Sequence, residues 1–317
     1  MCLVLPDVPP RAPLSRAAVP RYITPVKAFL LGANGQLGHE LAGVLSCFAH
    51  VSPATEADFD MTDAAALRRA IDAAAPDVII NAAAFTDVDG AEKHPMSAAR
   101  VNAEAVGVLG DEARIRRCAL IHYSTDFVFD GTKAAPYVET DDPCPVNEYG
   151  RSKLAGENAL LQADAPAIVF RTAWVYGLRC KSFVSTILRL ARERTTLRIV
   201  NDQVGNPTFC RDLAEATAVV LFGMRAAPFE RVRELRGIYH LAGAGACSRF
   251  ELAREVVALD PARAEQVLQS LEPIATSAYP LPARRPAHAV LDCSKARNEL
   301  GIALPPWRSS LARALAG

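Results

Sequence analysis

The chain has 317 residues, half of them apolar, and its 35 basic residues (Lys plus Arg) are matched by 35 acidic ones (Asp plus Glu). That balance excludes a global field that would attract nucleic acid or an anionic membrane, and it favours small-molecule chemistry. Apolar runs such as 218–222 are far shorter than the roughly 20 residues of a membrane-spanning helix. We therefore expect a globular protein with neither nucleic-acid nor membrane partners.

The eight cysteines are scattered singly, with no C-x-x-C pair and no histidine at ligand spacing. The pattern indicates neither a zinc site nor a disulfide framework, and it gives no metal-ligating residues. Unpaired cysteines are typical of a reducing compartment, so the expected location is the cytoplasm.

Residues 1–25 are rich in proline and arginine and contain no hydrophobic stretch like that of a signal peptide. We predict a disordered arm or an over-long start here. A transit peptide is the alternative, but this density of prolines disfavours the amphipathic helix that such a peptide needs.

From Val26 onward, strand-like and helix-like segments alternate. "VKAFLLG" is typical of a strand buried on both faces, and "GQLGHELAGVL" after it has helical apolar spacing. Later strands are predicted at 77–83, 119–125 and 167–177, and helices at 97–117, 148–157 and 183–194. This alternation predicts an α/β fold, a Rossmann-type doubly wound parallel sheet.

Beyond residue 178 the alternation loosens. A helix is predicted at 211–224, a strand at 237–243, and a helix start at Ser248, which has Glu251 at capping-box spacing. The segment 272–286 carries four prolines, so it can be neither helix nor central strand, and we predict an extended, functional loop.

We divide the chain accordingly. An NAD(P)-binding Rossmann domain is predicted at 26–177, with segments at about 204–245 returning to it. A smaller C-terminal substrate-binding domain is predicted to consist mainly of 178–203 and 246–317.

The turn after the first strand reads "GANGQLG", with Gly32, Gly35 and Gly38 where a helix should begin. Glycines here allow close backbone approach, and the helix N-terminus offers N–H groups to a pyrophosphate. A plain turn is the alternative, but the strand before and the helix after favour a dinucleotide. The predicted cofactor contacts in this turn also include Asn34, Gln36 and Leu37.

The second strand is followed by Ser52 and Thr55 rather than by a clear acid, which favours NADPH, while Glu56 keeps NADH open. Further cofactor contacts are predicted near the adenine and at the end of the third strand: Asp60, Met61, Ala82, Ala83 and Ala84.

The fourth strand ends in "HYSTDF", and "EYGRSKLAGE" follows on a predicted helix that carries Tyr149 and Lys153 four residues apart. The two side chains share a helix face, so the ammonium should lower the phenol's pKa and make it a usable acid. Thr125 is the first choice and Ser124 the second for a hydroxyl that binds the same substrate oxygen. Alone the pair could be a solvated face; the Gly-rich turn and the strand ending favour catalysis.

In order along about residues 26–310, "GANGQLG", "PDVIINAAAFTDVDGAE", "STDFVFDG", "EYGRSKLAGE", "RTAWVYG", "NDQVGNPT" and "TSAYPLPARRP" resemble the dTDP-4-dehydrorhamnose reductase family of extended short-chain dehydrogenases/reductases. The resemblance implies NAD(P)H-dependent reduction of the C4 ketone of dTDP-4-dehydro-6-deoxy-L-mannose to dTDP-L-rhamnose. It implies that Tyr149 donates the proton, that Lys153 tunes Tyr149 and holds the nicotinamide ribose, and that Thr125 fixes the keto oxygen.

The resemblance also implies a substrate site, for which we expect contacts from Thr125, Phe127, Trp174, Asp202, Gln203, Tyr279 and Arg285. Trp174 would offer a flat face for stacking, and Arg285 would bind the diphosphate. The sequence departs from the family at Phe127, where a second tyrosine is common, and at Ser182 and Ala289.

A magnesium ion and a homodimer are further implications of the resemblance. Two alternatives stay open at this point. One is another extended short-chain enzyme, a sugar-nucleotide epimerase or dehydratase that retains NAD. The other is a non-catalytic regulatory subunit like that of methionine adenosyltransferase, which resembles the same family.

Overall fold

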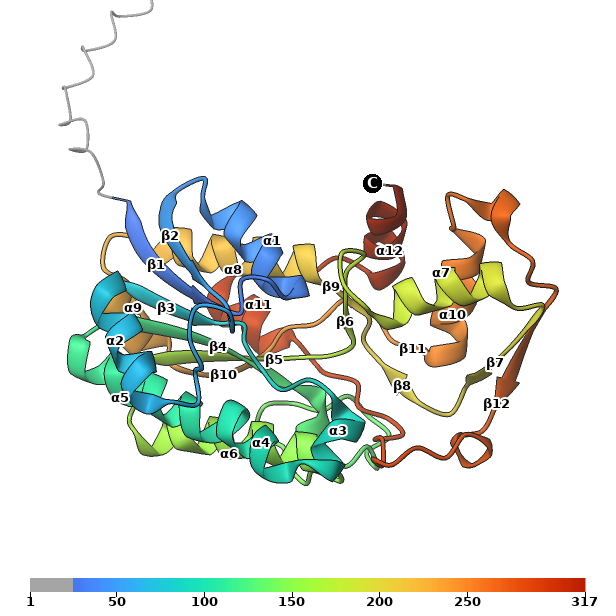
Figure 1. Ribbon diagram of the computed structural model, residues 1–317, viewed down its shortest axis with the longest axis horizontal. Helices are drawn as coiled ribbons and strands as arrows, with labels where there is room; N and C mark the ends of the chain where they lie inside the picture. The colour runs from blue at the N-terminus through green and yellow to red at the C-terminus, as the bar shows by residue number, and fades with distance from the viewer. Residues whose placement is uncertain (1–24, 317) are drawn as a thin grey trace, which may run out of the picture.

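The computed structural model describes residues 25–316, so the predicted arm at 1–25 lies almost wholly outside the described range. Within that range a layered α/β unit occupies one half of the molecule, and a smaller group of helices and short strands occupies the other (Figure 1). None of the helices between residues 25 and 316 has the length and apolar character needed to cross a membrane.

The larger half is built on one six-stranded sheet in the order β10-β5-β4-β3-β1-β2, with every neighbouring pair parallel. The strands are β1 Val26–Leu31, β2 Ala49–Ala54, β3 Val78–Asn81, β4 Ala119–Thr125, β5 Ala167–Thr172 and β10 Gly237–His240. The chain leaves β1 for β2 on one side and returns to β3 on the other. The carboxyl ends of β1 and β3 therefore form the switch point at which open sheets bind ligands.

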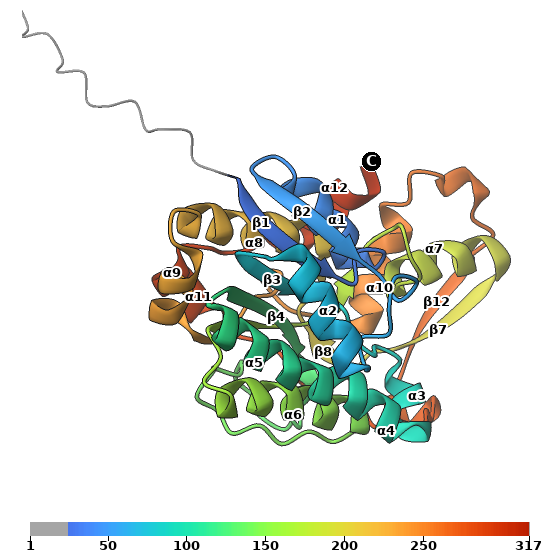
Figure 2. The ribbon, with the colours of Figure 1, turned by 60° about the vertical axis from the view of Figure 1, so that its left-hand side comes forward.

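Helices cover both faces of this sheet. Apolar side chains of one group pack with one set of strand residues, and those of the second group pack with the other set. The first group is α1 Gln36–Leu45, α8 Cys210–Met224, α9 Pro228–Leu235 and α11 Ser294–Leu300; the second is α2 Ala64–Ala74, α5 Ala105–Arg116 and α6 Glu148–Gln162. Figure 2 shows α2, α5 and α6 together on the near face. The predicted doubly wound fold is confirmed.

The helix predicted at 97–117 is broken into parts. It begins as α4 Pro95–Ala99, passes through a π-helical turn at Arg100–Glu104 and continues as α5. Asn102 in that turn bonds the backbone of Phe85 and the hydroxyl of Ser152 on α6. The turn thus fastens α6 and the loop before α3 (Val88–Lys93) to each other.

The smaller half has its own core, formed by α7 Phe183–Glu193, α10 Arg249–Ala258 and α12 Trp307–Ala316. Three two-stranded sheets accompany these helices. Their strands are β7 Thr196–Val200 with β12 Ser270–Ile274, β6 Val175–Tyr176 with β9 Thr208–Phe209, and β8 Val204–Gly205 with β11 Cys247–Ser248. The sequence predicted none of the three pairs.

The Pro-rich segment 272–286 is only partly the loop that the sequence predicts. Its first residues belong to β12, where Pro273 lies opposite Ile199 of β7, and a 3-10 turn follows at Thr276–Ala278. Proline is tolerated here because a two-stranded sheet consists of edge strands alone.

Candidate active site

The turn between β1 and α1 is shaped so that only glycine fits at two positions. Gly32 has φ +75°, and a Cβ on Gly38 would lie 2.0 Å from the Gly32 carbonyl oxygen. A Cβ on Gly32 would lie 2.7 Å from the backbone nitrogen of Ala83, so the turn and the end of β3 are in close contact. Backbone therefore comes close at the N-terminus of α1, which is where a pyrophosphate binds. This cradle fits a dinucleotide.

Other predicted cofactor residues surround this turn. The amide of Asn34 donates to both carboxylate oxygens of Glu56, at 3.0 Å each, and this bond contributes to lowering the pKa of Glu56. The amide of Gln36 donates to the carbonyl of Lys181, which fastens the turn to the segment before α7. Leu37 packs against the core of the sheet.

The residues predicted near the adenine lie in the turn between β2 and α2. The exposed Asp60 accepts hydrogen bonds from the backbone and hydroxyl of Thr62, and these bonds lower its pKa. Met61 is partly buried against the core of the sheet. The predicted contacts Ala82, Ala83 and Ala84 are also partly buried, directly after β3.

At the carboxyl end of β4 the two candidate hydroxyls have different surroundings. Ser124 donates to the buried carboxylate of Glu157, which also forms a buried ion pair with Arg171. The Thr125 hydroxyl accepts from the Phe127 backbone at 3.2 Å and contacts Asp126 at 3.1 Å. Ser124 is thus committed to an internal network, which favours Thr125 as the hydroxyl that can reach a ligand.

The expected effect of Lys153 on Tyr149 is wrong for this structure. Burial raises the pKa of Tyr149 to about 12, the Thr125 hydroxyl acts against this rise, and Asp126 adds to it. The Lys153 ammonium donates to the Tyr123 carbonyl at 2.6 Å, so it is held by the strand rather than by the phenol. Burial lowers the pKa of Lys153 to about 8.

A buried polar chain links this lysine to the switch point. Lys153 Nζ lies 3.4 Å from His122 Nε2, and His122 Nδ1 lies 3.1 Å from the Asn81 amide at the end of β3. Burial, followed by the Lys153 charge, holds the pKa of His122 well below its usual value. His122 is therefore neutral, and it fixes the position of Lys153 relative to β3.

Next to these residues lies a cavity of about 1130 Å³ between α7, β7 and the Pro-rich segment. Thr125, Tyr149 and Lys153 do not line it themselves. It adjoins them through Phe127, which lines the cavity and packs edge-on against Tyr149 with ring centroids 5.8 Å apart. At the position where the resemblance leads us to expect a second tyrosine, this ring contacts Tyr149 without offering it a hydroxyl.

Trp174 does not offer the open face expected for stacking. The Arg249 guanidinium lies over its indole, 3.5 Å from the ring centroid. A Cβ on Gly205 would lie 2.6 Å from Trp174 Cε2, so the ring is also closely covered there. The backbone of Trp174 has φ +44°, a strained value for a bulky residue.

Arg285 is also placed differently from the expectation. Its two terminal nitrogens donate to the two carboxylate oxygens of Asp89 on α3, each at 2.7 Å, so both nitrogens are already engaged in a bidentate ion pair. This ion pair ties the Pro-rich segment to α3, and the expected diphosphate contact of Arg285 stays a prediction.

The other predicted substrate residues line the cavity. Asp202 accepts from the backbone and hydroxyl of Thr276, and the Gln203 amide donates to the same hydroxyl. Both residues therefore brace the turn before Tyr279, which is 56% exposed. Of the two other departures, Ser182 caps α7 and Ala289 is buried.

Three residues at or beside the site are not among the predicted ones, namely Asp126, Arg198 and Arg249. Burial raises the pKa of Asp126 to about 7, with the Thr125 hydroxyl and the charge of Arg249 acting against the rise. A carboxylate directly after the predicted catalytic threonine was a usable signal. The arginines gave none, because isolated basic residues are common on surfaces.

Between residues 25 and 316 no group of three or more His, Cys, Asp or Glu side chains is placed to hold a metal ion. The geometry on this edge of the sheet suits a bound dinucleotide beside a hydroxyl, a phenol and an ammonium. Such a set can place a carbonyl next to a hydride donor and supply a proton to its oxygen.

Comparison with known proteins agrees with this arrangement. The profile of the family described as "RmlD substrate binding domain" matches residues 26–317. A dTDP-4-dehydrorhamnose reductase of Burkholderia thailandensis is 44% identical over 288 residues, which is 89% of this chain and 96% of the relative. That of Escherichia coli K12 is 36% identical over 293 residues, covering 90% of this chain and 96% of the relative.

A solved structure is also similar. The dTDP-4-dehydrorhamnose reductase of Bacillus anthracis, determined in complex with NADP, superposes with a TM-score of 0.83 at 30% identity. The match covers 92% of this chain and 99% of that one.

Proposed function

The chain belongs to the RmlD substrate binding domain family, and from that membership we propose that it reduces the C4 ketone of dTDP-4-dehydro-6-deoxy-L-mannose with NADPH. The product is dTDP-L-rhamnose. The observation that carries the proposal is the meeting of the glycine cradle, the end of β4 and the face of α6 at one edge of the sheet. The relatives' names favour a reductase over the epimerase, dehydratase and regulatory-subunit alternatives.

The cradle of Gly32, Gly35 and Gly38 would hold the pyrophosphate of the cofactor, and Lys153 would hold the nicotinamide ribose. NADPH, when bound, supplies the hydride that adds to the ketone carbon. The relative bound to NADP supports this choice of cofactor.

Tyr149 supplies the proton. Because burial raises its pKa to about 12, the phenol keeps its proton at neutral pH and can give it to the alkoxide oxygen as the C–H bond forms. The hydroxyl of Thr125 orients the same oxygen. One hydride and one proton convert the ketone to the alcohol, so the step balances.

Several finer points are proposals of the same kind. The cofactor-binding part comprises 26–177 with the returning segment 204–245, and the remainder carries the substrate. Residues 294–304 are an exception, because Ala296, Ile302 and Leu304 pack into the core of the sheet. A homodimer and a magnesium requirement follow from the resemblance, and a cytoplasmic location follows from the unpaired cysteines. We assign no step to a metal ion.

The test is substrate-dependent NADPH oxidation by the purified chain, with the Tyr149→Phe variant beside it. We expect turnover by the wild type and a loss of about 10²- to 10⁴-fold in kcat for the variant, the usual contribution of a positioned acid. Tyr176→Phe is the matched control, because the buried Tyr176 hydroxyl has no hydrogen-bond partner among residues 25–316. Folded wild-type protein that oxidises neither NADPH nor NADH would overturn the proposal.

A further inference from the structure

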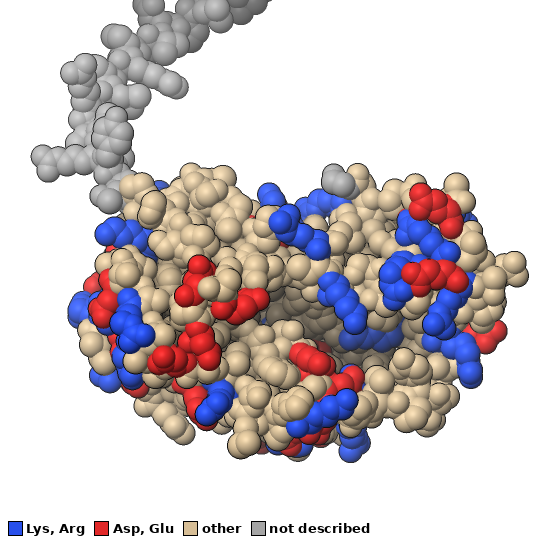
Figure 3. Space-filling model, viewed as in Figure 1, with Lys and Arg blue, Asp and Glu red and all other residues tan. Residues whose placement is uncertain are grey.

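The cavity beside the active site is strongly cationic. It is lined by five arginines (Arg194, Arg198, Arg249, Arg284 and Arg285) and only two aspartates (Asp130 and Asp202). Both aspartates are already hydrogen-bonded, Asp130 by Tyr137 and Asp202 by Thr276. Figure 3 shows basic side chains gathered along the hollow between the two halves of the molecule. The cavity is therefore suited to an anion.

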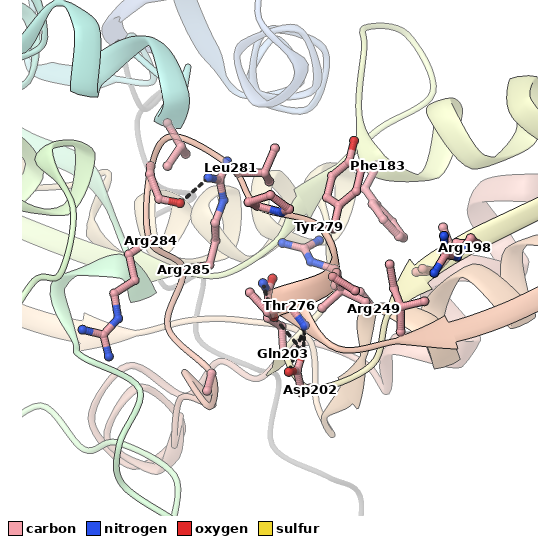
Figure 4. A pocket seen from close by; sticks show the side chains of 18 of the residues that line it. Phe183, Arg198, Asp202, Gln203, Arg249, Thr276, Tyr279, Leu281, Arg284 and Arg285 are labelled. Atoms are coloured by element: carbon pink, nitrogen blue, oxygen red, sulfur yellow. Dashed lines mark hydrogen bonds between the residues drawn. The ribbon is translucent and has the colours of Figure 1, made fainter.

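Not every arginine here can serve that anion. Arg285 is held in a two-point ion pair by Asp89. Arg284 is exposed, and its guanidinium points away from the other labelled residues in Figure 4. These two arginines lie on the Pro-rich segment, so that segment places no unpaired guanidinium group at the centre of the cavity.

Arg249 lies in an environment that disfavours its own charge. It is the first residue of α10, where the helix dipole presents its positive end. Burial also lowers its pKa to about 10, although the charge of the buried Asp126 acts against this fall. Across residues 25–316 no carboxylate lies within 4.0 Å of its guanidinium, which rests on the Trp174 ring instead. A positively charged Arg249 in this environment is explained if its guanidinium binds an anionic ligand.

Arg198 is the second candidate. It lies on β7, paired with Glu272 of β12 in the strand register, and its side chain is exposed to the cavity. It forms no ion pair with any carboxylate in the described part of the chain. Arg198 and Arg249 therefore line one cavity from neighbouring elements, because α10 packs on β7, and neither has a carboxylate partner between residues 25 and 316. Arg194, the exposed residue at the end of α7, has no such partner either, but its element carries no second arginine of the cavity.

We propose that Arg249 and Arg198 form the diphosphate subsite for the sugar nucleotide, in place of Arg285. The inference rests on the proposed function and deepens it. Arg249 rests on Trp174, which closely follows β5, and β5 lies next to β4 in the sheet, so Arg249 lies at the sugar end. The cavity wall also has apolar parts, which include Ile199, Ile274 and Tyr279 and suit the nucleoside. Guanidinium forks bind phosphate oxygens in pairs.

The experiment is calorimetric titration of dTDP and of thymidine into the full chain and into four variants. Arg198→Gln and Arg249→Gln should each bind dTDP about 10- to 100-fold more weakly, the usual effect of losing a hydrogen bond from a charged group. Their affinity for thymidine should stay within about twofold, since thymidine lacks the phosphates. In turnover, KM for the sugar nucleotide should rise much more than kcat falls.

Arg254→Gln is the matched control. It removes the same charge from the same helix, but Arg254 is exposed and lies outside the cavity, so dTDP affinity should not change. Arg249→Lys, which keeps the charge without the fork, should recover part of the affinity. An equal loss in the Arg254→Gln variant would show a general field effect and overturn the subsite.

Other outcomes also decide the matter. Wild-type dTDP affinity in both cavity variants, or an equal loss of dTDP and thymidine affinity, would overturn the subsite even if the wild type reduces its substrate. Tight dTDP binding that depends on both arginines, in a chain that oxidises no NADPH, would support the subsite and remove the reductase proposal.

Discussion

The two sides of the active site satisfy their charged groups in opposite ways. At the edge of the sheet, Lys153 is only 2% exposed and its ammonium is bonded to the Tyr123 carbonyl, while Glu157 is paired with Arg171. Across the cleft, Arg198 and Arg249 have no carboxylate partner within the described residues. The difference teaches that the edge of the sheet holds its charged groups with internal bonds, whereas the other side keeps two guanidinium groups without a carboxylate partner, as the proposed diphosphate subsite requires.

The largest expected effect comes from breaking the buried ion pair at the edge of the sheet. Glu157→Gln removes the charge that neutralises the buried Arg171 and receives Ser124, so it should lower the free energy of unfolding by about 3 to 5 kcal/mol. Urea unfolding followed by circular dichroism measures this. Glu193→Gln, in the exposed pair with Arg189, should cost less than about 0.5 kcal/mol. Similar costs for the two variants would remove the contrast between the two sides.

The glycine turn between β1 and α1 lies at the edge of the sheet, and close backbone contacts hold it in place. In Gly38→Ala the added Cβ would meet the Gly32 carbonyl at 2.0 Å, so the turn must shift, at a cost equivalent to about 10- to 100-fold in NADPH affinity. Fluorescence titration measures the affinity. Gly43→Ala on the same helix is the control, because its Cβ would meet nothing within 4 Å. Unchanged affinity in Gly38→Ala would show that the cofactor does not depend on this close approach.

The same division explains what could be predicted from the sequence. Buried runs, glycine spacing and the four-residue step from Tyr149 to Lys153 are local patterns, and they led to the sheet and the catalytic edge. The partner of Arg285 is 196 residues away, and β7 pairs with β12 although Thr196 and its partner Ser270 are far apart in the chain. Local spacing carries no signal for such pairings, so the arrangement of the cavity could not be predicted.

A smaller effect concerns Asp126, at the junction of the two sides. Burial raises its pKa from 3.8 to about 7, so between these values the folded chain binds a proton that the unfolded chain has lost. Its contribution to stability is therefore full below about pH 4 and is lost as the pH rises through 7. Relative to Asp126→Asn, the wild type should lose about 1 kcal/mol of unfolding free energy between pH 5 and 6. Parallel pH profiles of the two proteins would contradict this.

The smallest expected effect concerns Glu56 and the choice between NADPH and NADH, at the ribose end of the glycine turn. Glu56 lies just after β2, the position from which an acid contacts a ribose 2′-hydroxyl and repels a 2′-phosphate, and the Asn34 amide holds it there. Glu56→Gln keeps the shape and an acceptor for Asn34 but removes the charge. The ratio of kcat/KM for NADPH to that for NADH should therefore rise about two- to fivefold. Asp58→Asn is the control, because Asp58 carries the same charge in the same loop but bonds only Thr55. If both variants shift the ratio equally, the preference reflects the general charge of the loop; a shift confined to Glu56→Gln would assign cofactor choice to a side chain that an internal bond keeps in place.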